Sequence, residues 1–124
     1  MEARARKTAS SPKLLEEYVQ RLSKEYPRST IILFGSRARG EESASSDYDI
    51  MVIVEEADDK LKLLENMRRL KPHGISVDLL VLGVDELDDP VIAKMLEKSK
   101  ILYNGLHLDL QKTLSPRTPR PATR

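Results

Sequence analysis

Apolar residues recur along the chain at two different spacings, which predict helices and strands in alternation. Near the start, five of them follow the spacing that keeps one helix face apolar: Leu14, Leu15, Tyr18, Val19 and Leu22. Ser11 followed by Pro12 is typical of a helix start, and the helix is expected to end before Pro27. Thr30 to Phe34 is a short β-branched and apolar run, which predicts a buried strand.

The alternation continues through the middle of the chain. Tyr48 to Val54, rich in Ile and Val, predicts a second strand, and Ile75 to Leu82 predicts a third. Between them Asp58 is a candidate helix N-cap, and Pro72 with Gly74 ends that helix. The apolar face expected for this helix consists of Leu61, Leu64, Met67 and Leu70 or their neighbours.

Asp89 followed by Pro90 opens another helix. One side of it is expected to carry Val91, Ile92, Met95 and Leu96. Ile101 to Tyr103 fits a short edge strand, and the leucines at 106, 110 and 114 permit a last short helix. This order predicts an α/β protein with a small mixed sheet of three or four strands flanked by helices. The last two apolar faces are first expected to pack in the core, with a partner or self-association surface as the second interpretation.

The length of 124 residues suits a single domain. We expect a flexible basic N-terminus at 1–11, the folded domain at 12–104, the short helix at 105–114 and a disordered basic tail at 115–124. Apolar residues make up 40% of the chain, yet no run approaches the roughly 20 apolar residues of a membrane span. Cysteine is absent, which excludes disulfides, a thiol nucleophile and a Cys-ligated metal. With no apolar run behind the basic start, a cytoplasmic protein is expected.

The charge is unevenly distributed. The chain has net charge +1, but residues 1–10 carry +2 and residues 115–124 carry +3, which leaves −4 for the remainder. An acidic centre argues against electrostatic binding of nucleic acid. Aromatic residues are only 4% of the chain, so a base-stacking platform is not expected either.

One polar stretch, residues 35–49, follows the first predicted strand and carries the candidate chemistry. Gly35 lets the backbone approach a ligand closely and adopt strained dihedral angles. Ser36 offers a hydroxyl and a backbone N–H, and a helix starting here would direct several free N–H groups at an anion. Arg37 and Arg39 add positive charge suited to a triphosphate, although solvated surface arginines are an equal alternative. These four are the candidate nucleotide-binding residues.

Asp47 and Asp49 stand two residues apart where the second strand begins, so their side chains are expected on one face. Two carboxylates in that position repel each other unless a cation lies between them. Mg²⁺ fits best, because it prefers a few carboxylates together with substrate phosphates.

Asp78 lies inside the otherwise apolar run ISVDLLVL. A carboxylate in a buried strand is costly unless it is paired, protonated or bound to metal. If this strand lies beside that of Asp47 and Asp49, Asp78 can reach the same pair of Mg²⁺ ions and orient or deprotonate an attacking hydroxyl. The three aspartates are therefore the candidate catalytic and metal-binding residues.

Taken singly, each of these features has a plain explanation. Gly35 and Ser36 fit a strand-to-helix turn, Asp47 and Asp49 a polar loop entering a strand, and Asp78 an edge-strand carboxylate facing water. Their combination favours the metal site.

The segment LFGSRARGEESASSDYDIMVIV with VDLLVL downstream resembles the DNA polymerase β-type nucleotidyltransferase superfamily. Within it, the chain is most similar to the minimal nucleotidyltransferases, which are often paired with a small all-helical HEPN protein. The pattern is Gly-Ser, a gap, Asp-x-Asp and a third Asp on a later strand, here Gly35-Ser36, Asp47-x-Asp49 and Asp78. The resemblance covers about Leu14 to Tyr103 and marks the folded domain as a nucleotidyltransferase domain.

The resemblance implies that a nucleoside monophosphate, by family likeness AMP from ATP, moves with the help of Mg²⁺ to a hydroxyl acceptor. It further implies an antitoxin whose acceptor is a tyrosine on a HEPN toxin partner. Two alternatives stay open: nucleotidyl transfer to a small molecule or RNA, and a non-catalytic module that masks a toxin by covering it. The sequence leaves open the acceptor, the base preference, the number of nucleotides transferred and the oligomeric state.

Overall fold

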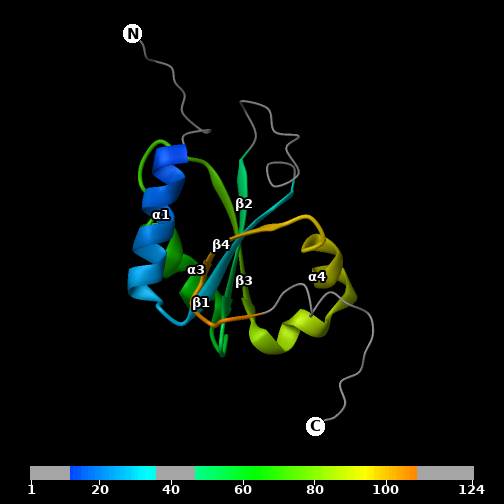
Figure 1. The fold of residues 1–124 in the computed structure, drawn as a ribbon. Coiled ribbons are helices and arrows are strands. Elements are labelled where there is room, and N and C mark those ends of the chain that lie inside the picture. The colour runs from blue at the N-terminus through cyan, green and yellow to red at the C-terminus, as the bar shows by residue number, and fades with distance from the viewer. Residues whose placement is uncertain (1–11, 36–46, 109–124) are drawn as a thin grey trace.

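A computed structural model describes residues 12–35 and 47–108, and it shows one sheet with helices on both faces (Figure 1). The described elements are α1 (Pro12–Glu25), β1 (Ser29–Phe34), β2 (Tyr48–Val54), α3 (Lys60–Arg69), β3 (Val77–Gly83), the 3₁₀ helix η2 (Val84–Asp88), α4 (Pro90–Met95) and β4 (Lys100–Asn104). This confirms the α/β class and the small mixed sheet. The expected terminal tails lie outside the described residues, and so does most of the helix expected at 105–114, of which residues 105–108 are described and are not helical.

The sheet has four strands in the order β3-β2-β1-β4. Strand β1 is antiparallel to both its neighbours, β2 and β4, whereas β2 and β3 are parallel. Helix α3 connects the two parallel strands, as a crossover must. As a result, β2 and β3 start at the same end of the sheet at which β1 finishes. We call this end of the strands the site end.

Side chains of the sheet alternate between two apolar cores. In β2, Ile50 and Val52 pack on the face covered by α1 and α3, while Met51 and Ile53 pack on the face covered by η2 and α4 (Figure 1). All four of these side chains are fully buried. Burial on both faces explains why this strand is apolar almost throughout instead of alternating with polar residues.

The N-cap of α3 and one apolar position in each of α3 and α4 differ from the prediction. The N-cap of α3 is Asp59 and not Asp58, since the Asp59 carboxylate accepts a hydrogen bond from the backbone N–H of Lys62 at 3.1 Å. With this start, Leu63 faces the core and Leu61 is 67% exposed. In α4, Asp89 is the N-cap as expected, but Val91 in the first turn points to solvent and is 65% exposed.

A 3₁₀ helix was also missed between β3 and α4. The acidic residues here, Asp85, Glu86 and Asp88, are typical of a solvated loop. Glu86 instead turns back and accepts a hydrogen bond from the backbone N–H of Gly83. The turn buries Leu87 in the core beneath α4. No helix among the described residues is long and apolar enough to cross a membrane.

Candidate active site

The sheet register brings two of the candidate aspartates directly together. Asp49 of β2 pairs with Asp78 of β3 in the parallel ladder, second in each strand from its start. Neighbouring strands lie about 4.8 Å apart, so side chains at paired positions on one face are adjacent. The condition attached to Asp78, that its strand lie beside the strand of the Asp-x-Asp motif, is therefore met.

Gly35 packs against the carboxylate of Asp49. Phe34 is the register partner of Asp49 on β1, and Gly35 follows it with φ +77°, a backbone conformation that favours glycine. A Cβ at this position would lie 3.0 Å from Cγ of Asp49 and closer still to Oδ2. The absence of a side chain at residue 35 is thus what leaves room for the Asp49 carboxylate.

Asp47 precedes β2 and is exposed, as is Asp78, while Asp49 is half-buried. Tyr48 between the two motif aspartates is buried in the core beneath α1 and α3, as the alternation of a strand requires. Asp49 belongs to the opposite set, with Met51 and Ile53, and therefore lies on the α4 face of the sheet.

The structure confirms the simpler explanation given for Asp78, an edge-strand carboxylate that faces water. The strand is at the margin of the sheet and the carboxylate faces water, so its presence there needs no partner to offset burial. What singles out Asp78 is its register with Asp49 and not a buried environment.

The three aspartates suit an Mg²⁺ ion that the protein coordinates only in part. Among the described residues no group of three or more His, Cys, Asp or Glu side chains forms a ready-made metal cage. Mg²⁺ is commonly held by one or two carboxylates, with substrate phosphates and water completing its shell. The exposed Asp47 and Asp78 and the half-buried Asp49 are compatible with such an arrangement.

Three of the predicted nucleotide-binding residues, Ser36, Arg37 and Arg39, lie outside the described residues. The structure therefore brings together Gly35, Asp49 and Asp78, with Asp47 just before β2, and leaves the roles of the other three as predictions.

A cavity of about 460 Å³ at the site end was not anticipated from the sequence. It lies between the end of β1 and the end of α4, and it is lined by Phe34, Gly35, Lys94, Met95, Glu97 and Lys98. Lys94 and Lys98 are exposed and four residues apart at the end of α4 and just beyond it. A sequence signal existed, since lysine at both positions follows the helical spacing, but nothing local linked that helix to Gly35.

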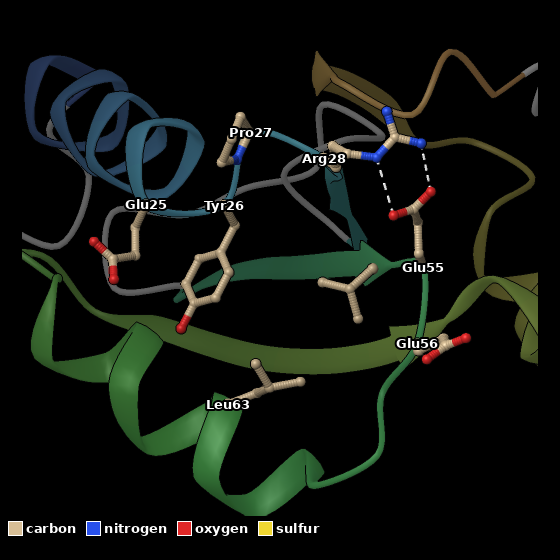
Figure 2. A pocket seen from close by; sticks show the side chains of 8 residues that line it. Glu25, Tyr26, Pro27, Arg28, Glu55, Glu56 and Leu63 are labelled. Atoms are coloured by element: carbon tan, nitrogen blue, oxygen red, sulfur yellow. Dashed lines mark hydrogen bonds and ion pairs between the residues drawn. The ribbon is translucent and has the colours of Figure 1, made fainter.

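A larger cavity of about 730 Å³ lies at the other end of the strands (Figure 2). It is lined by Glu25, Tyr26, Pro27, Arg28, Val54, Glu55, Glu56 and Leu63. Its charged side chains include the ion pair of Arg28 with Glu55, drawn in Figure 2. None of the candidate aspartates lines this cavity, so its larger size does not make it the site of the chemistry.

Comparison with known proteins identifies the family of the chain. Residues 16–105 match the family model "Polymerase beta, Nucleotidyltransferase". The chain belongs to this nucleotidyltransferase family. The matched range contains the candidate glycine and all three aspartates, together with every described strand. Enzymatic nucleotidyl transfer, which the pattern of Gly-Ser and three aspartates suggested, is therefore the activity of its family.

Several relatives of this nucleotidyltransferase come from Methanocaldococcus jannaschii. One, named "Putative protein adenylyltransferase", is 37% identical over 97 residues, covering 77% of this chain and 97% of the relative. A second protein with that name is 34% identical over 101 residues, with the same coverage of both chains.

Two solved structures share the fold. A crystal structure described as a "putative nucleotidyltransferase" from Sulfolobus solfataricus superposes with a TM-score of 0.59 at 24% identity, covering 74% of this chain and 78% of that one. A chain from a crystal structure of a toxin–antitoxin with AMP-PNP gives a TM-score of 0.52 at 22% identity and covers 80% of each chain. At these identities the likeness concerns the fold alone.

Proposed function

We propose that this nucleotidyltransferase transfers AMP from ATP, with Mg²⁺, to a hydroxyl group on another protein. The observation that carries the proposal is the placement of Asp49 opposite Asp78 at the strand end beside Gly35. The naming of its curated relatives as adenylyltransferases of proteins supports the choice of nucleotide and acceptor. By its resemblance to the minimal nucleotidyltransferases, we further propose an antitoxin whose acceptor is a tyrosine on a HEPN toxin.

In the proposed reaction the acceptor oxygen forms a bond with the α-phosphorus of ATP, the bond from that phosphorus to the bridging oxygen breaks, and pyrophosphate leaves. Asp47, Asp49 and Asp78 would hold Mg²⁺, which neutralises charge on the phosphate oxygens. Asp78 faces water at the margin of the sheet and is therefore open to an acceptor. It accepts the proton of the attacking hydroxyl, and the site aligns acceptor, phosphorus and leaving group.

A protein acceptor also agrees with the architecture of the described residues. Helices α1 and α3 cover one sheet face and η2 with α4 cover the other, and within residues 12–35 and 47–108 no second lobe stands over the site end (Figure 1). The three aspartates are at least partly exposed there. A partner that presents its own hydroxyl would complete the site. The toxin–antitoxin structure with AMP-PNP among the fold neighbours is consistent with that partner being a toxin.

The test uses ATP labelled at the α-phosphate, Mg²⁺, the purified chain and a lysate of its source cells. We expect one labelled protein band, whose mass identifies the acceptor. The Asp47→Asn, Asp49→Asn double variant should give no band. Asp88→Asn, an exposed change in η2 at the far end of β3, is the matched control and should label normally.

Other outcomes would redirect the proposal. Label that enters RNA or a small molecule, and is lost in the double variant, would keep the chemistry and replace the acceptor. No variant-sensitive label with any of the four nucleotides would contradict the enzyme. Full rescue of cells from the toxin by the double variant would show that covering the toxin is sufficient for antitoxin action.

A further inference from the structure

We propose that Lys94 and Lys98 bind the β- and γ-phosphates of the nucleotide and thereby select a triphosphate over a monophosphate. This inference rests on the proposed function and deepens it. Both side chains line the cavity that contacts Gly35, on the α4 face of the sheet where Asp49 also lies. The two lysines and the register pair Asp49 and Asp78 thus contribute opposite charges to one end of one sheet face.

The position of the lysines follows from how the chain returns to the sheet. Helix α4 begins at Pro90, beyond the far end of β3, and the buried Ile92 within it and Leu96 at its C-cap hold it against the core beneath. The helix therefore travels back along the strands and ends beside Phe34 and Gly35. Lys100, a few residues later, already pairs with Leu33 near the end of β1. The lysines are brought to the site by tertiary packing and not by proximity in sequence.

Both ammonium groups are available to a ligand. Lys94 is 79% exposed at its side chain, and its nearest charged partner in the described structure is Glu97, with 3.9 Å between Nζ and Oε1. An exposed pair at that distance contributes little. Lys98 makes no hydrogen bond or ion pair within residues 12–35 and 47–108, and it too is exposed. Neither lysine is therefore committed to holding the fold together.

The charges of a Mg²⁺-bound triphosphate suit this division. Carboxylates attract the metal but repel phosphate oxygens, so the outer phosphates need cations from another part of the protein. Lysine provides a compact charge on a flexible stem, which suits a phosphate whose position changes as the leaving group departs. The cavity, at about 460 Å³, falls within the usual range of roughly 300–1,000 Å³ for small-molecule sites. Phe34 and Met95 supply its apolar surface, against which the lysine stems can lie.

The experiment measures binding of Mg-ATP and of AMP to the full chain by isothermal titration calorimetry. The test variant is Lys94→Gln, Lys98→Gln. The matched control is Lys13→Gln, Lys24→Gln, which removes two exposed lysines from α1 on the opposite face of the sheet. We expect the test variant to bind ATP about 10- to 100-fold more weakly than the control variant, with AMP affinity unchanged. Inorganic tripolyphosphate should compete with ATP on the wild-type chain and much less on the test variant.

Equal ATP affinity in the two variants would overturn the inference, and so would an equal loss of ATP and AMP affinity. The result is separate from that of the transfer assay. Lysine-dependent ATP binding without any transfer would support the phosphate site while contradicting the proposed enzyme. Transfer with the same KM for ATP in both variants would support the enzyme and overturn the phosphate site.

Discussion

The two ends of the sheet differ in how their polar groups are used. At the far end they bond to one another: the Tyr103 hydroxyl donates to the carbonyl of Pro27 at 2.7 Å, and Thr30 donates to Asn104 at 2.8 Å. Arg28 and Glu55 form a two-bonded ion pair beside them (Figure 2). At the site end, by contrast, the carboxylates of Asp47 and Asp78 make no hydrogen bond or ion pair within the described residues.

This contrast indicates which end maintains the fold, and it supports our proposal that the other end binds the nucleotide. Internal hydrogen bonds stabilise a structure modestly, and an unpaired donor or acceptor left in the interior is costly. The exposed carboxylates of Asp47 and Asp78 make no such bonds within the described residues, so they contribute little to the stability of the fold. We therefore expect loss of the carboxylates at the site end to abolish activity without loss of stability, and loss of the buried polar contacts elsewhere to do the opposite.

The largest effect is expected from Asp78→Asn. It removes one carboxylate of the Asp49–Asp78 pair and with it the proposed proton acceptor, so kcat/KM for transfer should fall about 100-fold or more. Because Asp78 is exposed and its carboxylate makes no hydrogen bond or ion pair within the described residues, the Tm should change little. Calorimetry and the labelling assay on one preparation test both halves. A large fall in Tm would show that Asp78 is structural and break the comparison.

Gly35→Ala should affect both properties. A side chain is strained at φ +77°, at a cost of about 1 kcal/mol or more, and its Cβ would displace the Asp49 carboxylate, so transfer should fall about 10-fold or more. Gly74→Ala is the matched control. Gly74 has φ +94°, but a Cβ there would meet Leu14 of α1 at 3.2 Å and no carboxylate. Equal activity losses in the two variants would mean that strain alone, and not the displaced carboxylate, is responsible.

Tyr18→Phe should lower stability and leave activity intact. The buried Tyr18 hydroxyl donates to the carbonyl of Met67 at 2.8 Å and joins α1 to α3, so its loss should cost about 1 kcal/mol of unfolding free energy. Burial raises the pKa of Tyr18 from 10.0 to about 12. This group stabilises the folded state fully below pH 10, and that contribution is lost as the pH rises through 12. Urea unfolding at several pH values should show the wild-type advantage shrinking over that interval.

The smallest effect is expected from Glu86→Gln. The backbone N–H of Gly83 at 2.9 Å and the Lys60 ammonium at 2.5 Å hold the pKa of Glu86 below its ordinary value of 4.5. Because its pKa is lower in the folded state, ionised Glu86 stabilises the fold at pH values above the ordinary pKa. This stabilisation is lost as the pH falls through the pKa of the folded state. The variant should have a slightly lower Tm at pH 7, a deficit that shrinks below about pH 4.5, and unchanged transfer. Glu65→Gln, an exposed change on α3, should alter neither the Tm nor its pH dependence.

Local patterns predicted most of the elements. The β2 bounds agree with the apolar run, and α1 and α4 begin at the two prolines that mark the first helical turn. The errors were also local. Asp58 and Asp59 are equally good caps, and which of them bonds to a backbone N–H depends on how the chain leaves β2. The turn that forms η2 depends on Glu86 reaching Gly83 and Lys60, a contact that periodicity does not contain.

The sequence by itself predicted the α/β alternation, the bounds of β2 and the glycine that follows the first strand. These depend on the two-residue period of a strand and on backbone geometry, which are properties of a few consecutive residues. Only the tertiary structure decided that Asp78 pairs with Asp49, that β3 is an edge, and that Lys94 and Lys98 lie beside Gly35. Strand order and helix packing are set by the burial of apolar faces from distant segments, so no local pattern specifies them.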